Sequence, residues 1–236
     1  MASATPAPSG TLDFGRCFTY LTEDPDWLKK VLIGGAFALL SVILVGIPFV
    51  FGYAGRTLKN VAQGAARPLP EWDDLGGIFG EGLQLAAVYL AHVFLALLVF
   101  GVLFGIALVP AIAAGALSDG RGSEAIGALS GLAFVGIYGF VMLGSLALGV
   151  YLPAALTRTA LRGTIADGFD WRRNVDFIRA NVGNYLLSLV VFFVAHFLSQ
   201  FGMVLCCVGL FPAAFAGYLV GAAAFGQTAR LNPASL

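Results

Sequence analysis

The stretch between Arg179 and Arg230 constrains the fold most, because it contains no Asp, Glu, Lys or Arg. At about 1.5 Å of rise per residue, one helix over these positions would be about 75 Å long, more than twice the roughly 30 Å hydrocarbon core of a bilayer. We therefore expect the stretch to fold back on itself within a membrane or at its far edge. Glycine and proline break helices, so the sequence predicts a turn at Cys206–Pro212, with one membrane segment on each side.

The composition of the whole chain indicates the same class of protein. Hydrophobic residues make up 59% of it, charged residues only 11%, and the mean hydropathy is +0.89. So little polar surface cannot cover a soluble globule of this length, and the apolar side chains must face lipid. The chain is therefore predicted to be an all-α integral membrane protein, with the lipid bilayer as its partner and no nucleic acid.

The hydrophobic layout predicts a bundle of about six membrane helices in three hairpin-like units, 27–64, 71–163 and 170–231. Together these units form a single helical membrane domain over residues 12–231, between a disordered Ala/Pro/Ser-rich tail at 1–11 and a short tail at 232–236. The expected membrane segments are 31–46, 47–64, 83–112, 125–156, 183–204 and 206–229.

An alternative exists for the first two segments, because residues 31–54 are long enough to form one ordinary span, which would give five membrane segments. The charges of the loops favour a turn at Gly46-Ile47-Pro48. This turn places twelve of the thirteen Lys and Arg residues on one side of the membrane, with only Arg121 opposite. Basic residues gather on the cytoplasmic side, so both termini are predicted to be cytoplasmic.

Aromatic and basic residues recur where the apolar segments begin and end. Three tryptophans that follow an acidic residue each begin a segment that soon becomes apolar, and each hairpin unit ends in a tyrosine followed by an arginine. Tryptophan favours the headgroup layer, because its ring prefers hydrocarbon while its N–H needs a polar partner. Interfacial anchors are therefore predicted at Trp27, Trp72, Trp171, Tyr53, Tyr151, Tyr218, Arg56, Arg158 and Arg230.

The segment that precedes the first membrane helix is expected to be a short amphipathic helix. Phe14, Cys17, Phe18 and Leu21 share one helical face. Such a face either lies on the membrane surface or packs into a protein core, and both interpretations remain open at this point.

Two sequence motifs carry a family resemblance. Residues 24–35 read DPDWLKKVLIGG, Gly52-Tyr53 follow, and residues 69–74 read LPEWDD. In these motifs, over residues 13 to about 85, the chain closely resembles the DUF4013 family of prokaryotic membrane proteins, and the remainder matches in hydrophobic layout. The family is uncharacterised, so the resemblance implies a location in the prokaryotic cytoplasmic membrane and no particular activity.

The motifs of soluble catalysis are missing from the sequence. It has no pair of histidines around a Glu at metalloprotease spacing and no Gly-rich Lys-Ser/Thr loop, and Gly80-Glu81-Gly82 lacks the third glycine of a dinucleotide site. We therefore predict that the chain is not an enzyme and has no catalytic residues and no metal site.

The two histidines are the candidate cofactor residues. His92 and His196 lie in similar apolar surroundings, at comparable distances from the expected membrane edges at 83 and 183. Neutral imidazoles can ligate the metal of chlorophyll a, and two opposed imidazoles can hold haem b. The alternative is that each ring hydrogen-bonds to a neighbouring helix, assisted at His196 by Gln200 one turn away. No cofactor is expected, and a haem or chlorophyll site is the alternative.

Two further patterns bear on partners. The pairs Gly101–Gly105, Gly127–Gly131 and Gly217–Gly221 have a spacing that lets helices approach closely, either within the protein or against another membrane subunit or a second copy. The acidic loop with Glu71, Asp73 and Asp74 fits a helix start, because acids stabilise the N-terminal end of the helix dipole. Alternatively it docks a cytoplasmic partner or forms a gate that faces Arg158, Arg162, Arg172 and Arg173.

Two functions from different classes follow. The first is a structural or accessory protein, a scaffold or subunit of a larger membrane assembly. The second is a small-solute permease, favoured by the repeats and the broken helices and disfavoured by the lack of charged residues near the midplane. The sequence favours the accessory protein.

Overall fold

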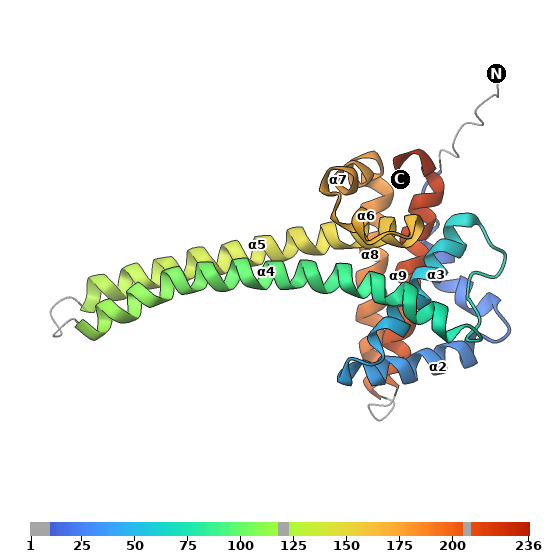
Figure 1. Cartoon of the computed structure of the whole chain (residues 1–236), viewed down its shortest axis with the longest axis horizontal. Helices are drawn as coiled ribbons and strands as arrows, with labels where there is room; N and C mark the ends of the chain where they lie inside the picture. Colours follow the sequence, from blue (N-terminus) through green and yellow to red (C-terminus); the bar gives the residue numbers. More distant parts are fainter. Residues whose placement is uncertain (1–9, 118–122, 205–208) are drawn as a thin grey trace, which may run out of the picture. The chain divides into compact units, whose positions relative to one another are not determined.

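The computed structural model describes residues 10–117, 123–204 and 209–236, and its regular elements over these ranges are all helices. In chain order they are α1 (Phe14–Thr19), η1 (Tyr20–Glu23), α2 (Trp27–Leu40), η2 (Ser41–Ile43), α3 (Ile47–Gln63), α4 (Leu75–Leu117), α5 (Ser123–Arg162), α6 (Ile165–Phe169), α7 (Trp171–Ala180), α8 (Val182–Ser199), η3 (Gln200–Val204), α9 (Leu210–Leu231) and η4 (Pro233–Ser235). Figure 1 labels α2 to α9. Most of the predicted tail at 1–11, Arg121 and the Cys206-Cys207 part of the predicted turn lie outside the described residues.

Four helices within the described ranges are long and apolar enough to cross a membrane: Leu75–Ile106, Gly131–Arg162, Val182–Val204 and Leu210–Leu231. The last four predicted segments fall on these helices, and the chain is a helical membrane protein. The first two predicted segments form α2 and α3, which are not among the four candidates. At 14 residues, α2 is only about 21 Å long. Helix α3 contains the polar residues Arg56, Lys59 and Asn60, which break up its apolar sequence.

The alternative of one continuous helix over 31–54 is wrong. The chain turns between α2 and α3, where Leu44 takes a positive φ of 68°. Gly46 makes this turn possible, because a Cβ atom there would lie 1.8 Å from the carbonyl oxygen of Phe37. The helix boundaries around Gly46-Ile47-Pro48 therefore agree with the turn that the sequence favours.

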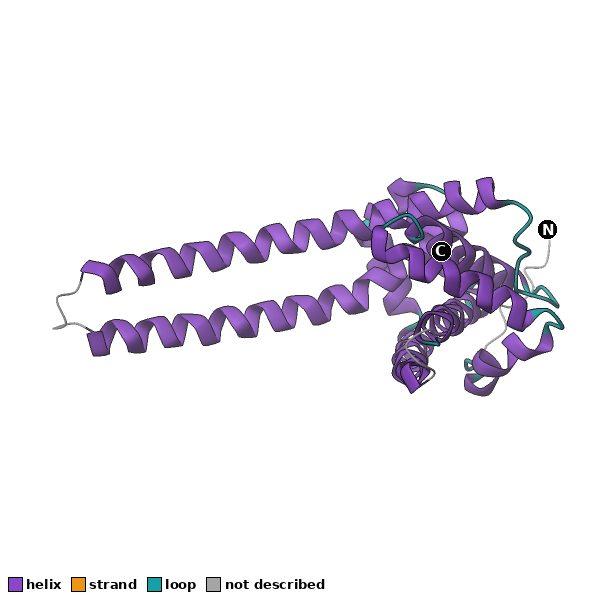
Figure 2. Ribbon diagram, turned by 90° about the horizontal axis from the view of Figure 1, so that it is seen from below, coloured by secondary structure: helices purple, strands orange, loops and turns teal. Residues whose placement is uncertain are grey.

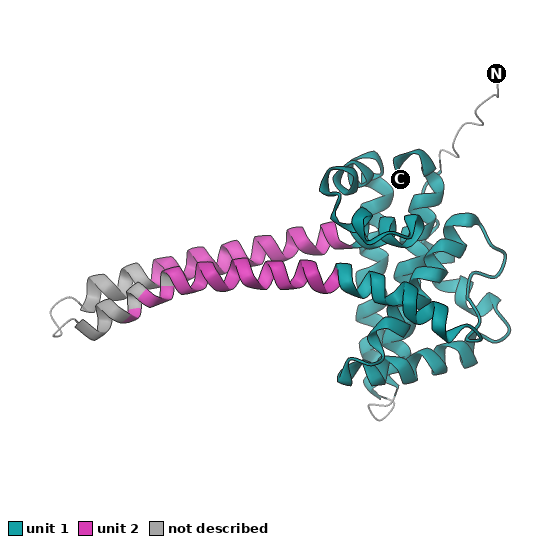
Figure 3. Cartoon of the chain, viewed as in Figure 1, with its two compact units in different colours: residues 1–88, 153–236 teal, residues 89–152 magenta. Residues whose placement is uncertain are grey.

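The described chain divides into two compact units (Figure 3). Unit 1 comprises residues 1–88 and 153–236, and unit 2 comprises residues 89–152, so α4 and α5 contribute to both. The predicted division into three hairpin-like units stays a prediction.

Helix α9 lies at the centre of unit 1 and packs against α2, α3 and α8. Its glycines permit close packing: a Cβ at Gly221 would meet the ring of Phe192 at 2.4 Å, and one at Gly217 would lie 3.4 Å from the oxygen of Ala195. The Gly217–Gly221 seam is therefore an internal contact between α9 and α8.

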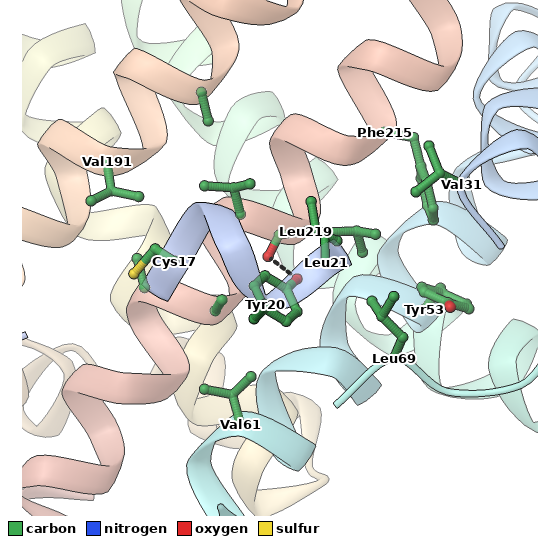
Figure 4. Packing of buried hydrophobic residues seen from close by; sticks show 14 of the residues in the cluster. Cys17, Tyr20, Leu21, Val31, Tyr53, Val61, Leu69, Val191, Phe215 and Leu219 are labelled. Atoms are coloured by element: carbon green, nitrogen blue, oxygen red, sulfur yellow. Dashed lines mark hydrogen bonds between the residues drawn. The ribbon is translucent and has the colours of Figure 1, made fainter. Parts of the chain in front are cut away.

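The amphipathic segment before α2 packs into this core. Cys17, Tyr20 and Leu21 are buried, and the Tyr20 hydroxyl donates a hydrogen bond of 2.8 Å to the carbonyl of Leu219 on α9 (Figure 4). The face with Cys17 and Leu21 could lie on the membrane surface or pack into a protein core, and in the structure it packs into the core.

Unit 2 consists of the apolar parts of α4 and α5, which form a helical pair (Figure 2). Phe100 on α4 contacts Phe140 on α5, with ring centroids 6.1 Å apart. Most of the large apolar side chains described in this unit are exposed, including Phe94, Val102 and Leu143. Such surfaces are stable only against lipid or against another apolar protein surface.

Candidate functional site

The loop with Trp72 is fixed to α2 by a buried lysine. Lys30 Nζ contacts Asp24 Oδ2 at 2.8 Å, Glu71 Oε1 at 2.5 Å and the carbonyl oxygen of Leu69 at 3.3 Å. Lys30 and Asp24 are each 3% exposed, whereas the Glu71 side chain is 64% exposed. The Lys30 ammonium therefore links α2 to Asp24, which precedes the helix, and to the loop that contains Leu69 and Glu71.

The charges of this cluster stabilise one another. Burial alone would raise the pKa of Asp24, but hydrogen bonds from Lys30 and the Asp26 amide bring it below its ordinary value. Burial alone would lower the pKa of Lys30, but its bonds to Asp24 and Glu71 raise it above its ordinary value. Both groups are therefore charged near neutral pH.

Trp72 lies in an aromatic stack inside unit 1. Its ring is 4.3 Å from that of Tyr53 and 5.0 Å from that of Phe37, and its Nε1 donates to the carbonyl of Lys30 at 3.1 Å. Tyr53 is fully buried and donates to the carbonyl of Pro70 at 2.8 Å. The polar atoms of both side chains thus have partners in the protein, and an interfacial role for Tyr53 and Trp72 stays a prediction.

The remaining predicted anchors differ in their surroundings. Arg158 is 1% exposed, and only its 3.4 Å contact from Nη2 to Asp167 Oδ1 is an ion pair, while its Nε has no hydrogen-bond partner among the described residues. Arg158 is thus internal, like Tyr53. Trp171 is exposed, with the Arg172 guanidinium 5.7 Å from its ring centroid. An interfacial role stays a prediction for Trp171 and likewise for Trp27, Tyr151, Tyr218, Arg56 and Arg230.

The acidic loop pairs with α2 and α3. Besides the Glu71–Lys30 pair, Asp74 Oδ2 lies 2.7 Å from Arg56 Nη2, and Asp74 Oδ1 accepts a bond from the Gly77 amide at the start of α4. This cap confirms the predicted helix start. The partners of Glu71 and Asp74 are Lys30 and Arg56, not the arginines of the predicted gate. Docking of a partner at Glu71, Asp73 and Asp74 stays a prediction.

A second charged cluster borders a cavity between α3, α4 and the end of α5. Glu81 accepts bonds from Arg56 Nε at 3.0 Å and from Lys59 Nζ at 3.1 Å, through different carboxylate oxygens. The cavity has a volume of about 210 Å³ and is lined by Gly55, Lys59, Glu81, Gln84, Leu85, Thr159, Ala160 and Gly163. This cavity could not be found from the sequence, because its lining comes from three distant segments of the chain.

His92 belongs to unit 2 and His196 to unit 1, so their pairing across a cofactor stays a prediction. The His92 ring lies 5.4 Å from that of Tyr151, at an open apolar groove of about 330 Å³. His196 Nδ1 is 3.0 Å from the carbonyl of Phe192, and its buried Nε2 has no hydrogen-bond partner among the described residues. Gln200 bonds to the carbonyl of His196 at 3.4 Å rather than to its ring.

The metal-binding residue types do not gather in the described parts of the chain: no group of three or more His, Cys, Asp or Glu there could hold a metal ion. The single cysteine described as free, Cys17, is buried, and burial together with the nearby Asp13 raises the pKa of its thiol to about 12.

The comparison with protein families identifies the chain. The sequence profile of a family described as "Protein of unknown function (DUF4013)" matches residues 36–208, which is more than half of the chain. The chain belongs to the DUF4013 family. The match includes LPEWDD and begins after DPDWLKKVLIGG. Comparisons with curated proteins and with solved structures found no match for this DUF4013 protein.

Proposed function

We propose that this DUF4013 protein is a non-catalytic accessory subunit that binds another membrane protein through the hairpin of unit 2. The observation that carries the proposal is the exposure of this hairpin. In the most apolar windows of α4 and α5, 6% and 0% of the residues are buried within the protein. Both helices therefore offer their surface to neighbours in the membrane.

One face of α4 is suited to a protein neighbour. Gly101 and Gly105 are four residues apart, and a Cβ atom added at either position would meet no atom of the described chain within 4 Å. Glycines at this spacing let two membrane helices approach closely, and close packing drives helix association where lipid offers no hydrophobic advantage. In contrast to Gly217–Gly221, this seam is open, and we assign it to the partner.

The polar groups of unit 1 support a structural role. Asp24, Lys30, Glu71 and Tyr53 are engaged in contacts that fix the loop at 68–74 onto α2 and α3. These contacts account for the residues of the two sequence motifs through folding, without a reaction.

The test is purification in a mild detergent, followed by measurement of the mass of the complex. A double variant, Gly101→Leu with Gly105→Leu, is expected to lose a partner that the natural protein retains at a fixed ratio. Gly149→Leu is the matched control, since a Cβ at Gly149 on α5 also meets no atom within 4 Å. Equal retention of the partner by both variants would contradict the assignment of the seam.

The permease alternative makes a different prediction. Purified protein in liposomes would then carry a solute across the bilayer without any partner, and its structure in a membrane would contain a water-filled midplane cavity. Flux that depends on this protein alone would overturn the accessory role. An absorption band of haem or chlorophyll in the purified protein would instead support cofactor binding at His92 or His196.

A further inference from the structure

The cavity between α3, α4 and the end of α5 lies where two membrane helices change from polar to apolar. No Asp, Glu, Lys or Arg occurs on α4 after Glu81, and on α5 none occurs between Glu124 and Arg158. Glu81 lines the cavity, and Thr159 on the other wall directly follows Arg158. Charged residues adjoining an apolar span mark the headgroup layer, so the cavity lies at the depth of the lipid headgroups.

The charged side chains of the cavity carry both signs. Lys59 Nζ and Glu81 Oε2 are 3.1 Å apart, and their side chains are 29% and 36% exposed. Glu81 also pairs with Arg56 through its other oxygen, so Lys59 shares its carboxylate with a second cation. A purely anionic ligand would be repelled by Glu81 and a purely cationic one by Lys59, whereas a zwitterion satisfies both.

The other lining residues limit the size and polarity of the ligand. Gln84 adds an amide with donors and an acceptor, and Leu85 offers an apolar wall. Gly163 leaves one side open, since a Cβ there would meet no atom within 4 Å. The volume of about 210 Å³ is below the roughly 300–1,000 Å³ of pockets for drug-sized ligands. It fits a compact group such as phosphoethanolamine.

We propose that this cavity binds a phosphodiester-ammonium zwitterion, the headgroup of phosphatidylethanolamine. Lys59 and the Gln84 amide donate to the phosphate oxygens, and Glu81 accepts from the ammonium group. Leu85 lies against the adjoining carbon chain. The site is independent of the partner seam at Gly101 and Gly105, and it holds whether or not the protein is an accessory subunit.

Native mass spectrometry of the detergent-solubilised protein tests the proposal. The protein is incubated in turn with phosphatidylethanolamine, phosphatidylglycerol and phosphatidylcholine of the same acyl chains. We expect preferential retention of phosphatidylethanolamine, because its ammonium group can donate hydrogen bonds to Glu81 and that of phosphatidylcholine cannot. Equal retention of the three lipids would overturn the proposal.

Three variants locate the bound lipid. Lys59→Met is expected to weaken phosphatidylethanolamine binding by about tenfold or more, the effect of losing one charge-assisted hydrogen bond. Lys59→Arg keeps the charge and is expected to retain most of the binding. Glu81→Gln is expected to shift the preference towards phosphatidylglycerol, because it removes the anion that disfavours a negatively charged headgroup.

Two controls complete the experiment. Lys29→Met removes an exposed lysine that does not line the cavity, and it is expected to leave lipid retention unchanged. Soluble glycerophosphoethanolamine, added in excess, distinguishes binding of the free headgroup from binding of the whole lipid. Displacement of the lipid shows that the free headgroup suffices. Persistence of the lipid shows that the acyl chains contribute to binding. Lipid loss of the same size in Lys29→Met and Lys59→Met would place the binding elsewhere.

Discussion

Replacement of Lys30 by methionine tests the role of the buried charge cluster most directly. Methionine can follow the path of the lysine stem, but it leaves Asp24 without its cation. Asp24 is 3% exposed and retains the Asp26 amide at 2.9 Å as its remaining hydrogen-bond donor within the cluster. Glu71 is 64% exposed and can return to water at small cost.

The expected loss of stability therefore comes mainly from Asp24. Breaking a buried ion pair by removing one partner costs about 3–5 kcal/mol, because the other charge stays buried without compensation. The free energy of unfolding of Lys30→Met is thus expected to fall by about that amount. Denaturant titration in detergent micelles, followed by the fluorescence of Trp72 and the other tryptophans, measures it. The double variant Asp24→Asn with Lys30→Met removes the stranded charge and is expected to recover most of the loss.

The pH dependence of the same variants gives an independent check. In the natural protein the folded pKa of Asp24 is lowered, so its stabilising contribution is present above the unfolded pKa near 3.9 and is lost as the pH falls through the folded value. Without Lys30, burial dominates and raises that pKa, so the deficit of Lys30→Met should shrink on acidification. A deficit below about 1 kcal/mol, the worth of an ordinary hydrogen bond, would refute the reasoning, as would failure of the double variant to recover.

Three further predictions concern the loop at 68–74, the buried thiol and the membrane topology. Tyr53→Phe removes the 2.8 Å bond to Pro70 and should lower the free energy of unfolding by about 1 kcal/mol, measured by the same titration; no change would show that this bond does not hold the loop. The Cys17 thiol, with a pKa of about 12, should react with a maleimide at pH 8 only after unfolding, and rapid labelling of the folded protein would contradict its burial. Cysteines introduced at positions 65, 120 and 165 should label with an impermeant reagent from outside intact cells only at 120, and labelling at 65 or 165 would reverse the predicted orientation.

The positions of the four long apolar helices and of the turn before α3 could be predicted from the sequence, because each follows from a local property. An uninterrupted apolar run defines α4, and the sequence Gly46-Ile47-Pro48 defines the turn before α3. The lengths were harder to predict. Helix α4 begins at Leu75, well before the predicted start at 83, because Asp74 caps it and Gly82 packs where a Cβ would lie 1.6 Å from the carbonyl oxygen of Pro48.

The orientation of the polar and aromatic residues could not be predicted in the same way. A tryptophan at the edge of an apolar segment has two stable locations, the headgroup layer or a core position where its N–H has an acceptor. For Trp72 the acceptor is the main-chain oxygen of Lys30, and a backbone acceptor leaves no trace in the sequence. Likewise, Lys29 and Lys30 are neighbours, yet Lys29 is exposed and Lys30 is buried, because only Lys30 reaches Asp24.

The two sequence motifs and the proposed functional surfaces occupy different parts of the protein. Asp24, Lys30, Tyr53 and Trp72 belong to the motifs, and in the structure they join the loop at 68–74 to α2 and α3. The charged groups of these residues are paired and their hydrogen-bonding atoms have partners in the protein. They therefore stabilise the fold and offer few free polar groups to a ligand. The open seam at Gly101 and Gly105 and the cavity at Lys59 and Glu81 lie outside these motifs, and both retain unfilled space. Variants at these two surfaces should therefore change what the protein binds with little effect on its stability, whereas variants of the motifs should lower its stability.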